Sequence, residues 1–122
     1  MPRPLLLQRF EVSSDVRGTL LPFELSEVPF AVRRVFTVTG PVGGATRGNH
    51  LVPCGQLLCL VAGSSEVRIG DDAQTLGDPV ALSEVGEYVI LEAGDYVTYT
   101  VPDESTTLLV LAEQPYAPRS SR

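Results

Sequence analysis

One histidine, His50, occurs in the whole sequence, and it lies in a glycine-rich segment that leads into an apolar one. This segment, residues 43–63, reads GGATRGNHLVPCGQLLCLVAG. Imidazole is the side chain that takes up and releases a proton near neutral pH with the least perturbation. Arg47, three residues earlier, carries a planar fork that suits a phosphate or a carboxylate. These residue types predict proton transfer on an anionic small molecule.

Cysteine and arginine are the other side chains that could take part in catalysis or binding. Cys54 becomes a nucleophile only if a neighbouring base such as His50 lowers its pKa, whereas Cys59 lies in an apolar run and suits core packing. The two cysteines form no C-x-x-C pair, which favours reduced thiols. All nine basic residues are arginine. This reflects either the coding of the gene or a need to bind anions, and composition leaves both open.

The charge and the apolar runs argue against several partners. A net charge of −6 disfavours nucleic acid and anionic membranes as partners. Residues 51–65 form the longest nearly uncharged apolar stretch, which is too short to span a bilayer. The opening MPRPLLLQRF lacks the apolar length of a signal peptide. Together with reduced thiols, these features predict a cytoplasmic protein.

The elements that must position His50 are predicted to be strands. Glycine or proline interrupts every window long enough for three helical turns. Short runs rich in Val, Leu, Ile, Thr and Tyr alternate instead with turn residues, which predicts an all-β sandwich or barrel. The runs are residues 19–25, 31–40, 55–63, 65–72, 80–85, 87–94, 95–101 and 106–113. The acidic turn at residues 70–72 is expected to join two strands of a hairpin.

Alternation assigns side chains to faces in two of these runs. Arg34, Phe36 and Val38 share one side of their strand, and Thr37 lies on the other. In the run 95–101 one face carries Tyr96, Thr98 and Thr100, and the other carries Val97, Tyr99 and Val101. In a small barrel the tyrosine and threonine face can line a ligand cavity; the alternative is a solvated strand face.

The spacing around His50 resembles the first cupin motif, in which a glycine precedes H-x-H, a glutamate and a second glycine. Gly44, His50, Val52, Gln56 and Gly63 stand at those positions. The second motif is matched by Gly86 and Gly94, with Glu92 in place of its proline and Val97 in place of its histidine. Of four expected metal ligands only His50 remains. We therefore predict that the protein holds no metal and no other cofactor.

The whole chain resembles the nucleotide-sugar 3,4-ketoisomerases, metal-free cupins that act on thymidine diphosphate (dTDP) 4-keto-6-deoxyglucose. Sequences of this family have the motif D-x-R-G-x-L near the N-terminus, then P-F-x-x-x-R-V-F and R-G-x-H-A-H. A glutamine follows seven residues after the first histidine. The matching residues are Asp15, Arg17, Gly18, Leu20, Glu24, Pro29, Phe30, Arg34, Val35, Phe36, Arg47, Gly48, His50 and Gln56.

This resemblance implies a single-domain cupin, a double-stranded β-helix or jelly-roll barrel, over residues 1–116, with a loose tail at 117–122. It also implies a homodimer in which the N-terminal strand, LLLQRFEV, crosses to the partner barrel. Arg17, Arg34 and Arg47 then correspond to arginines that hold the diphosphate and sugar. The alternative is that Arg17 and Arg34 form structural ion pairs with Asp15, Glu24 or Glu27.

The sequence departs from the family where chemistry is expected. Val52 replaces the second histidine of H-A-H, Thr37 replaces a tyrosine, and Tyr96 replaces a tryptophan. Either His50 alone carries the proton both ways, or Tyr96, Tyr99 or Glu24 acts as its partner. We predict His50 and Tyr96 as catalytic residues. The predicted substrate-binding residues are Arg17, Arg34, Arg47, Gln56, Tyr99, Thr37 and Glu24.

Three functions follow from these residues. The first is an isomerase of deoxysugar biosynthesis that transfers a proton beside a ketone on a dTDP-sugar. The second is a metal-free cupin cyclase or isomerase that tailors a polyketide or similar natural product, which the missing histidine motivates. The third is a catalytically inactive module that binds a nucleotide sugar or stabilises a partner enzyme.

Overall fold

The computed structural model describes residues 3–114 and is almost entirely β-structure. Its strands are β1 (Gln8–Arg9), β2 (Ser13–Asp15), β3 (Gly18–Leu20), β4 (Arg34–Thr39), β5 (Ala45–Leu51), β6 (Gln56–Ala62), β7 (Ser65–Gly70), β8 (Val80–Leu82), β9 (Glu87–Leu91), β10 (Tyr96–Val101) and β11 (Thr107–Ala112). A short 3₁₀ turn, η1 (Leu25–Glu27), precedes β4. None of the helical structure described is long and apolar enough to cross a membrane.

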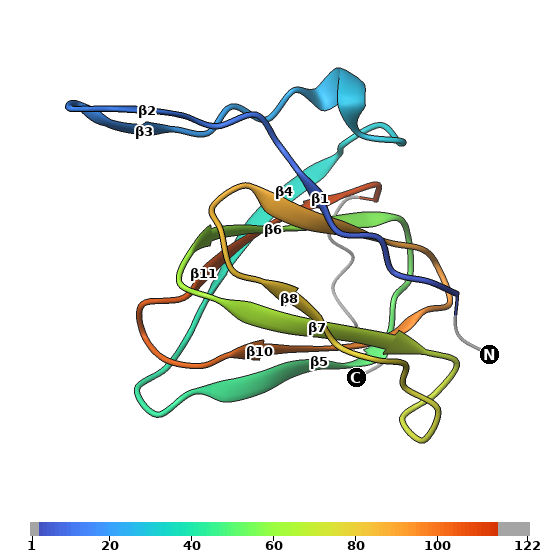
Figure 1. Cartoon of the computed structure of the whole chain (residues 1–122). Coiled ribbons are helices and arrows are strands. Elements are labelled where there is room, and N and C mark those ends of the chain that lie inside the picture. Colours follow the sequence, from blue (N-terminus) through green and yellow to red (C-terminus); the bar gives the residue numbers. More distant parts are fainter. Residues whose placement is uncertain (1–2, 115–122) are drawn as a thin grey trace.

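Two antiparallel sheets face each other and enclose the core (Figure 1). The larger sheet has the order β1-β9-β6-β11-β4, and the smaller has the order β5-β10-β7-β8. Strands β2 and β3 form a separate hairpin that projects away from these sheets (Figure 1). The predicted all-β architecture is therefore confirmed.

Most of the predicted runs coincide with strands, and two regions differ. In the run 19–25 only residues 19 and 20 belong to a strand, because Pro22 cannot donate to a strand ladder and η1 begins at Leu25. Strand β5 was not predicted, because Gly48 and Asn49 have low strand propensity; pairing with β10 holds it extended. The hairpin predicted around residues 70–72 exists between β7 and β8, but residues 71–79 form its connection.

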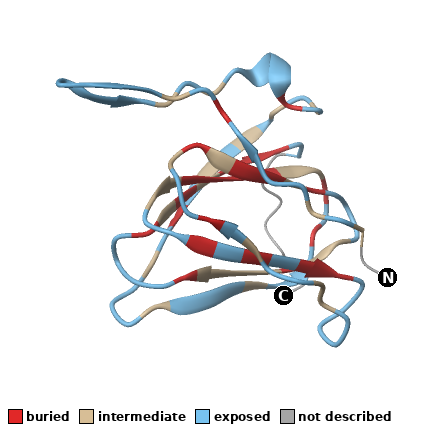
Figure 2. Cartoon of the chain, viewed as in Figure 1, coloured by how far each residue is buried: buried red, intermediate tan, exposed pale blue. Residues whose placement is uncertain are grey.

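The core has two parts, one on each face of the larger sheet. The inner core lies between the sheets and contains Leu58, Leu60 and Leu108. The outer core contains Leu57 and Cys59 and is covered by the N-terminal segment, including Phe10. Burial of each of these leucine side chains contributes about 1.5–3 kcal/mol to the free energy of unfolding, relative to an exposed side chain. Figure 2 shows buried residues concentrated in the facing sheets, whereas the β2–β3 hairpin is exposed.

Cys54 and Cys59 are both free and buried, and Cys59 makes stability depend on alkaline pH. Burial raises the pKa of the Cys59 thiol to about 12, whereas an unfolded chain releases that proton near pH 8.5. The full contribution is therefore present below pH 8.5 and is lost as pH rises toward 12. We expect the free energy of unfolding of the wild type to fall relative to that of Cys59→Ala by about 2 kcal/mol between pH 8 and pH 10.

Urea denaturation of both proteins at several pH values measures this difference, and contributions from the tyrosines cancel between them. A difference that stays constant from pH 8 to pH 10 would contradict the assignment to Cys59.

Candidate active site at the mouth of the barrel

A β-bulge in strand β5 sets the direction of the side chains around His50. In the ladder between β5 and β10, Val97 pairs with His50 and Thr98 pairs with Gly48, so Asn49 is an extra residue. Gly48 and Asn49 have φ values of +84° and +59°. Glycine and asparagine are the residues that adopt this left-handed region most readily. The sequence G-N therefore supplies the local conformation that the bulge requires.

The bulge places Arg47 and His50 on the same face of β5. In a regular strand two residues three positions apart point to opposite faces, and one extra residue restores them to one face. Directly paired residues of antiparallel strands share a face. His50 pairs with Val97 and Arg47 pairs with Tyr99, and both partners lie against the inner core. Arg47 and His50 therefore lie on the face of β5 that is turned toward the larger sheet, and both residues are exposed.

Tyr99 is the polar residue of β10 that faces inward. Burial raises the pKa of its phenol, while the charge of Arg47 and a hydrogen bond with that side chain lower it in part. Because the net shift is upward, Tyr99 remains protonated at neutral pH and keeps an O–H group to donate. Its contact with Arg47 joins the phenol to the guanidinium on this inner face.

The larger sheet contributes Gln56 and Arg34 to the same interior. Ala112 pairs with Gln56 on one side and with Arg34 on the other, so these residues form one rung across β6, β11 and β4. Gln56 lies in line with Leu58 of the inner core. The guanidinium carbon of Arg34 lies 4.4 Å from the centroid of the Phe36 ring, a cation–π contact.

Chain connectivity brings these groups to one end of the barrel. Strand β5 ends just after His50, and β6 begins at Gln56 after a connection of residues 52–55. The rung from Gln56 to Arg34 lies at that end, because it includes the first residue of β6. Strand β10 begins there as well, because Tyr96 pairs with Leu51 at the end of β5. The mouth of the barrel, defined here by Arg34, Arg47, His50, Gln56 and Tyr99, thus collects five of the nine predicted site residues.

Tyr96 and Thr37 lie on the outer faces of their sheets. Tyr96 pairs with Leu51 and Gly70 and points opposite to Val97, and Thr37 pairs with Leu109, which packs on the outer core. This corrects the prediction that the tyrosine and threonine face of β10 lines the cavity. The inner face is the one with Val97 and Tyr99, because that face packs against the larger sheet.

Arg17 and Glu24 lie outside the barrel in the N-terminal region. The Arg17 guanidinium pairs with the Asp15 carboxylate at 2.6 Å, and its side chain is exposed at the tip of the β2–β3 hairpin. This contact holds the pKa of Asp15 below its usual value. The ion-pair alternative is therefore the arrangement seen for Arg17. Glu24 is exposed and precedes η1, where its carbonyl oxygen accepts a hydrogen bond from the amide of Glu27.

The residues at the mouth do not suit a divalent metal. At the positions where metal-binding cupins have further histidines, this chain has Val52 and Val97, each only 2% exposed. Throughout residues 3–114, no three His, Cys, Asp or Glu side chains lie together in a group able to hold a metal ion. One imidazole and one amide make a poor ligand set for Zn²⁺ or a similar ion.

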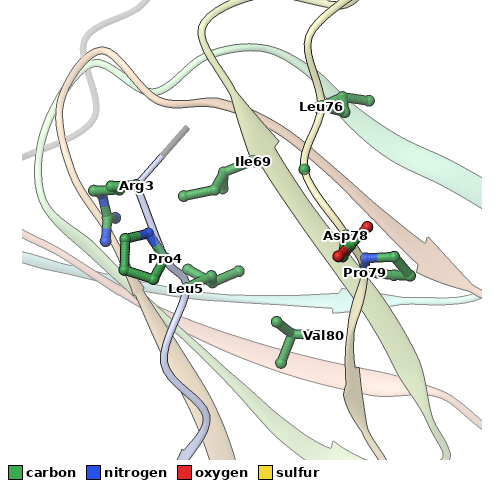
Figure 3. Close-up of a pocket in the computed structure, with 9 residues that line it drawn as sticks. Arg3, Pro4, Leu5, Ile69, Leu76, Asp78, Pro79 and Val80 are labelled. Carbon is green, nitrogen blue, oxygen red and sulfur yellow. The ribbon is translucent and has the colours of Figure 1, made fainter. Parts of the chain in front are cut away.

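A cleft of about 480 Å³ opens beside the N-terminal segment and was not predicted from the sequence. Figure 3 shows its lining residues, with Arg3, Pro4 and Leu5 from the N-terminal segment, and Ile69 and Val80 from β7 and β8. Ile69 pairs with Val97, which pairs with His50. The cleft therefore lies two strands, about 10 Å, from His50 along one inner rung.

Comparisons with known proteins agree with this architecture. The sequence model of the family described as FdtA, WxcM-like, C-terminal, matches residues 5–120. The chain is similar to QdtA, a sugar 3,4-ketoisomerase from Thermoanaerobacterium thermosaccharolyticum solved in complex with TDP, at 25% identity, covering 96% of this chain and 85% of that one with a TM-score of 0.80. No curated protein sequence gives a significant match.

Two further solved structures have the same fold at lower identity. One is the WlaRB TDP-quinovose 3,4-ketoisomerase from Campylobacter jejuni, with 21% identity, 98% and 92% of the two chains covered, and a TM-score of 0.79. The other is ChmJ, a 3'-monoepimerase from Streptomyces bikiniensis, with 21% identity, 93% and 66% covered, and a TM-score of 0.73. The fold is the cupin barrel that the sequence motifs predict, and the chain belongs to the FdtA family of WxcM-like, C-terminal proteins.

Proposed function

We propose that this protein is a metal-independent isomerase of the sugar 3,4-ketoisomerase type, which transfers a proton beside a ketone on a dTDP-linked deoxysugar. The observation that carries the proposal is the bulge at Gly48 and Asn49, because it turns Arg47 and His50 toward the same interior. Among similar structures, QdtA is described in complex with TDP and, as a mutant, with TDP-4-keto-6-deoxyglucose. A nucleotide sugar is thus the ligand class that the likeness supports.

In this reaction His50 acts as a single base. Its imidazole removes the proton from the carbon next to the ketone, and the electron pair of that C–H bond forms the enediolate. The imidazolium then returns the proton to the former carbonyl carbon, while the hydroxyl proton passes between the two oxygens. One imidazole serves both carbons because they are adjacent, which fits the absence of a second imidazole at Val52 and Val97.

Tyr99 and the arginines supply the electrostatic part. The protonated phenol of Tyr99, beside Arg47, is suited to donate to the oxygen on which negative charge develops. Arg34 and Arg47 give the mouth a positive lining in a chain of net charge −6, which suits a diphosphate. The amide of Gln56 adds hydrogen bonds to sugar hydroxyls.

The buried Val52 and Val97 favour a second candidate, a metal-free cyclase or isomerase that tailors a natural product, or a binding module without catalysis. An apolar rung beside one imidazole suits a less polar substrate than a nucleotide sugar. Loss of the second proton carrier is the feature that these alternatives explain directly.

The assembly that we propose is a homodimer formed by exchange of the N-terminal strand, with residues 1–116 as one cupin domain. The short strand β1 pairs only at the edge of β9, through two residue pairs, so it can move to a second copy without disturbing the barrel. Residues 115–122, which include the proposed tail, lie outside the described part of the chain. Light scattering at micromolar concentration distinguishes dimer from monomer.

The function is tested with TDP-4-keto-6-deoxyglucose in D₂O, followed by proton NMR. We expect deuterium at the sugar carbons beside the ketone, and TDP binding weakened about 10- to 100-fold in Arg47→Ala, because charged hydrogen bonds are lost. Arg68→Ala is the matched control, since Arg68 lies on the outer face of β7 and donates to the Gly77 carbonyl. Failure of the wild type to bind TDP would overturn the proposal, and binding with neither deuterium exchange nor conversion of the 4-keto to the 3-keto sugar would indicate the inactive module.

A further inference from the structure

Arg3 connects the N-terminal segment to the turn between β9 and β10. Its Nη2 atom donates to Asp95 Oδ2 at 2.6 Å and to the Ile90 carbonyl oxygen at 2.9 Å, and Nε lies 3.4 Å from Asp95 Oδ1. The Asp95 side chain is only 13% exposed. A guanidinium that contacts both carboxylate oxygens attracts the carboxylate and also fixes its orientation. Arg3 thus holds a nearly buried carboxylate in one position.

The Asp95 carboxylate in turn shapes the chain around it. Its Oδ2 atom accepts a hydrogen bond from the amide of Glu92 at 2.8 Å, and the Asp95 amide donates to the Glu92 carbonyl at 3.0 Å. The same turn holds Val52 by both backbone groups. The Val52 amide donates to the Asp95 carbonyl at 2.7 Å, and the Gly94 amide donates to the Val52 carbonyl at 2.9 Å.

Val52 and Val97 are both structural neighbours of His50, one along the chain and one across the strand ladder. Val52 follows His50 by two residues, directly after the end of β5, and its side chain is buried in the inner core. Val97 follows Asp95 by two residues and pairs with His50 across the ladder. A displacement of the turn at residues 92–95 therefore moves the two positions that hold the backbone of His50.

A further charge near this network is Glu92, whose carboxylate lies 3.7 Å from Arg3 Nε and is largely exposed. An exposed ion pair at this distance contributes little to the stability of the turn. The contact with Asp95 is different, because removal of the guanidinium leaves that carboxylate nearly buried and without its charged partner. The turn would then relax to hydrate Asp95.

We propose that Arg3 is a positioning residue, which acts through Asp95 and the turn at residues 92–95 to set the place of His50 at the mouth. The inference rests on the proposed function as far as turnover is concerned, whereas the structural coupling stands without it. Exchange of the N-terminal segment between two copies would make the same contact with the turn of the partner.

The single histidine makes the test direct, because its imidazole signals in an NMR spectrum need no assignment. We compare Arg3→Ala and Arg3→Lys with Arg9→Ala. Arg9 lies on the same N-terminal segment, donates to the Val85 carbonyl at 3.1 Å and lies 3.8 Å from Glu84, at the other end of the barrel. It is the matched control for loss of one arginine from this segment.

We expect Arg3→Ala to shift the His50 ring signals and to lower kcat about tenfold with KM changed less than twofold, and Arg9→Ala to leave all three unchanged. The ring signals and kcat of Arg3→Lys should lie between those of Arg3→Ala and the wild type. The lysine ammonium keeps the positive charge but lacks the planar, two-point geometry of the guanidinium. Unchanged ring signals in Arg3→Ala, or equal shifts in Arg9→Ala, would overturn the inference. If the sugar is no substrate, the ring signals alone decide. If Arg3→Ala does not fold, Asp95→Asn must give the same shift.

Discussion

Replacement of His50 by asparagine is expected to lower kcat toward TDP-4-keto-6-deoxyglucose by about 10²- to 10⁴-fold, the range of a lost general acid–base group. Asparagine keeps hydrogen-bonding capacity and similar size but cannot carry a proton between two carbons. TDP binding should change little, because Arg34 and Arg47 are the groups that we assign to the diphosphate. The exchange of solvent deuterium into the sugar should fall in parallel with turnover.

The matched control is Leu51→Asn, in the neighbouring position of β5. Leu51 is 56% exposed and pairs with Tyr96 on the outer face, so an asparagine there should leave turnover near the wild-type value. A normal thermal unfolding transition of His50→Asn would show that any loss is chemical, since His50 is exposed and lies outside both cores. Wild-type turnover in His50→Asn would show that the imidazole is not the catalytic base.

The strands were largely readable from the sequence because their apolar residues alternate. The run QLLCLVA, for example, is buried on both faces because an inner and an outer core lie on either side of β6. Strand β5 could not be read in this way. Its residues Ala45–Leu51 are exposed or half-buried and contain two residues with left-handed backbone, so only the pairing with β10 specifies it.

The site was predictable in its residues and less so in its geometry. Family motifs point to Arg34, Arg47, His50 and Gln56, and the strand register places all four at the same end of the barrel. Alternation separates Tyr96 from Tyr99, but it does not say which of them faces inward, because that depends on where the other sheet packs. The role of Arg3 carried no sequence signal, since its partner Asp95 is distant in sequence and both lie outside any family motif.

The direction of Arg47 and His50 depends on one glycine, Gly48, at the bulge of β5. A Cβ atom at Gly48 would lie 2.7 Å from the backbone oxygen of Val97, at a φ of +84°. The left-handed conformation alone costs a residue with a side chain about 1–2 kcal/mol, and contact with a backbone atom adds to this. We expect Gly48→Ala to destabilise the fold by about 2–3 kcal/mol and to lower kcat/KM by at least 100-fold.

The catalytic loss follows from register rather than from stability. If β5 relieves the contact by giving up the bulge, Arg47 and His50 turn to opposite faces, because they are three residues apart. Gly43→Ala separates the two effects. Gly43 has a φ of +86° and would place its Cβ in open space in the β4–β5 turn, so it should lose about 1 kcal/mol and keep full activity.

Thermal unfolding gives the stability of both variants, and kinetics with TDP binding gives their activity. The His50 ring signals report whether the imidazole has left the mouth in Gly48→Ala. Because the bulge is the observation on which the proposed function rests, a Gly48→Ala protein with wild-type turnover and binding would contradict both the register argument and the assignment of His50 and Arg47 to one site. Loss of activity in Gly48→Ala with retention in Gly43→Ala would link the local backbone to the chemistry, since the two substitutions are chemically identical and differ only in what the new methyl group meets.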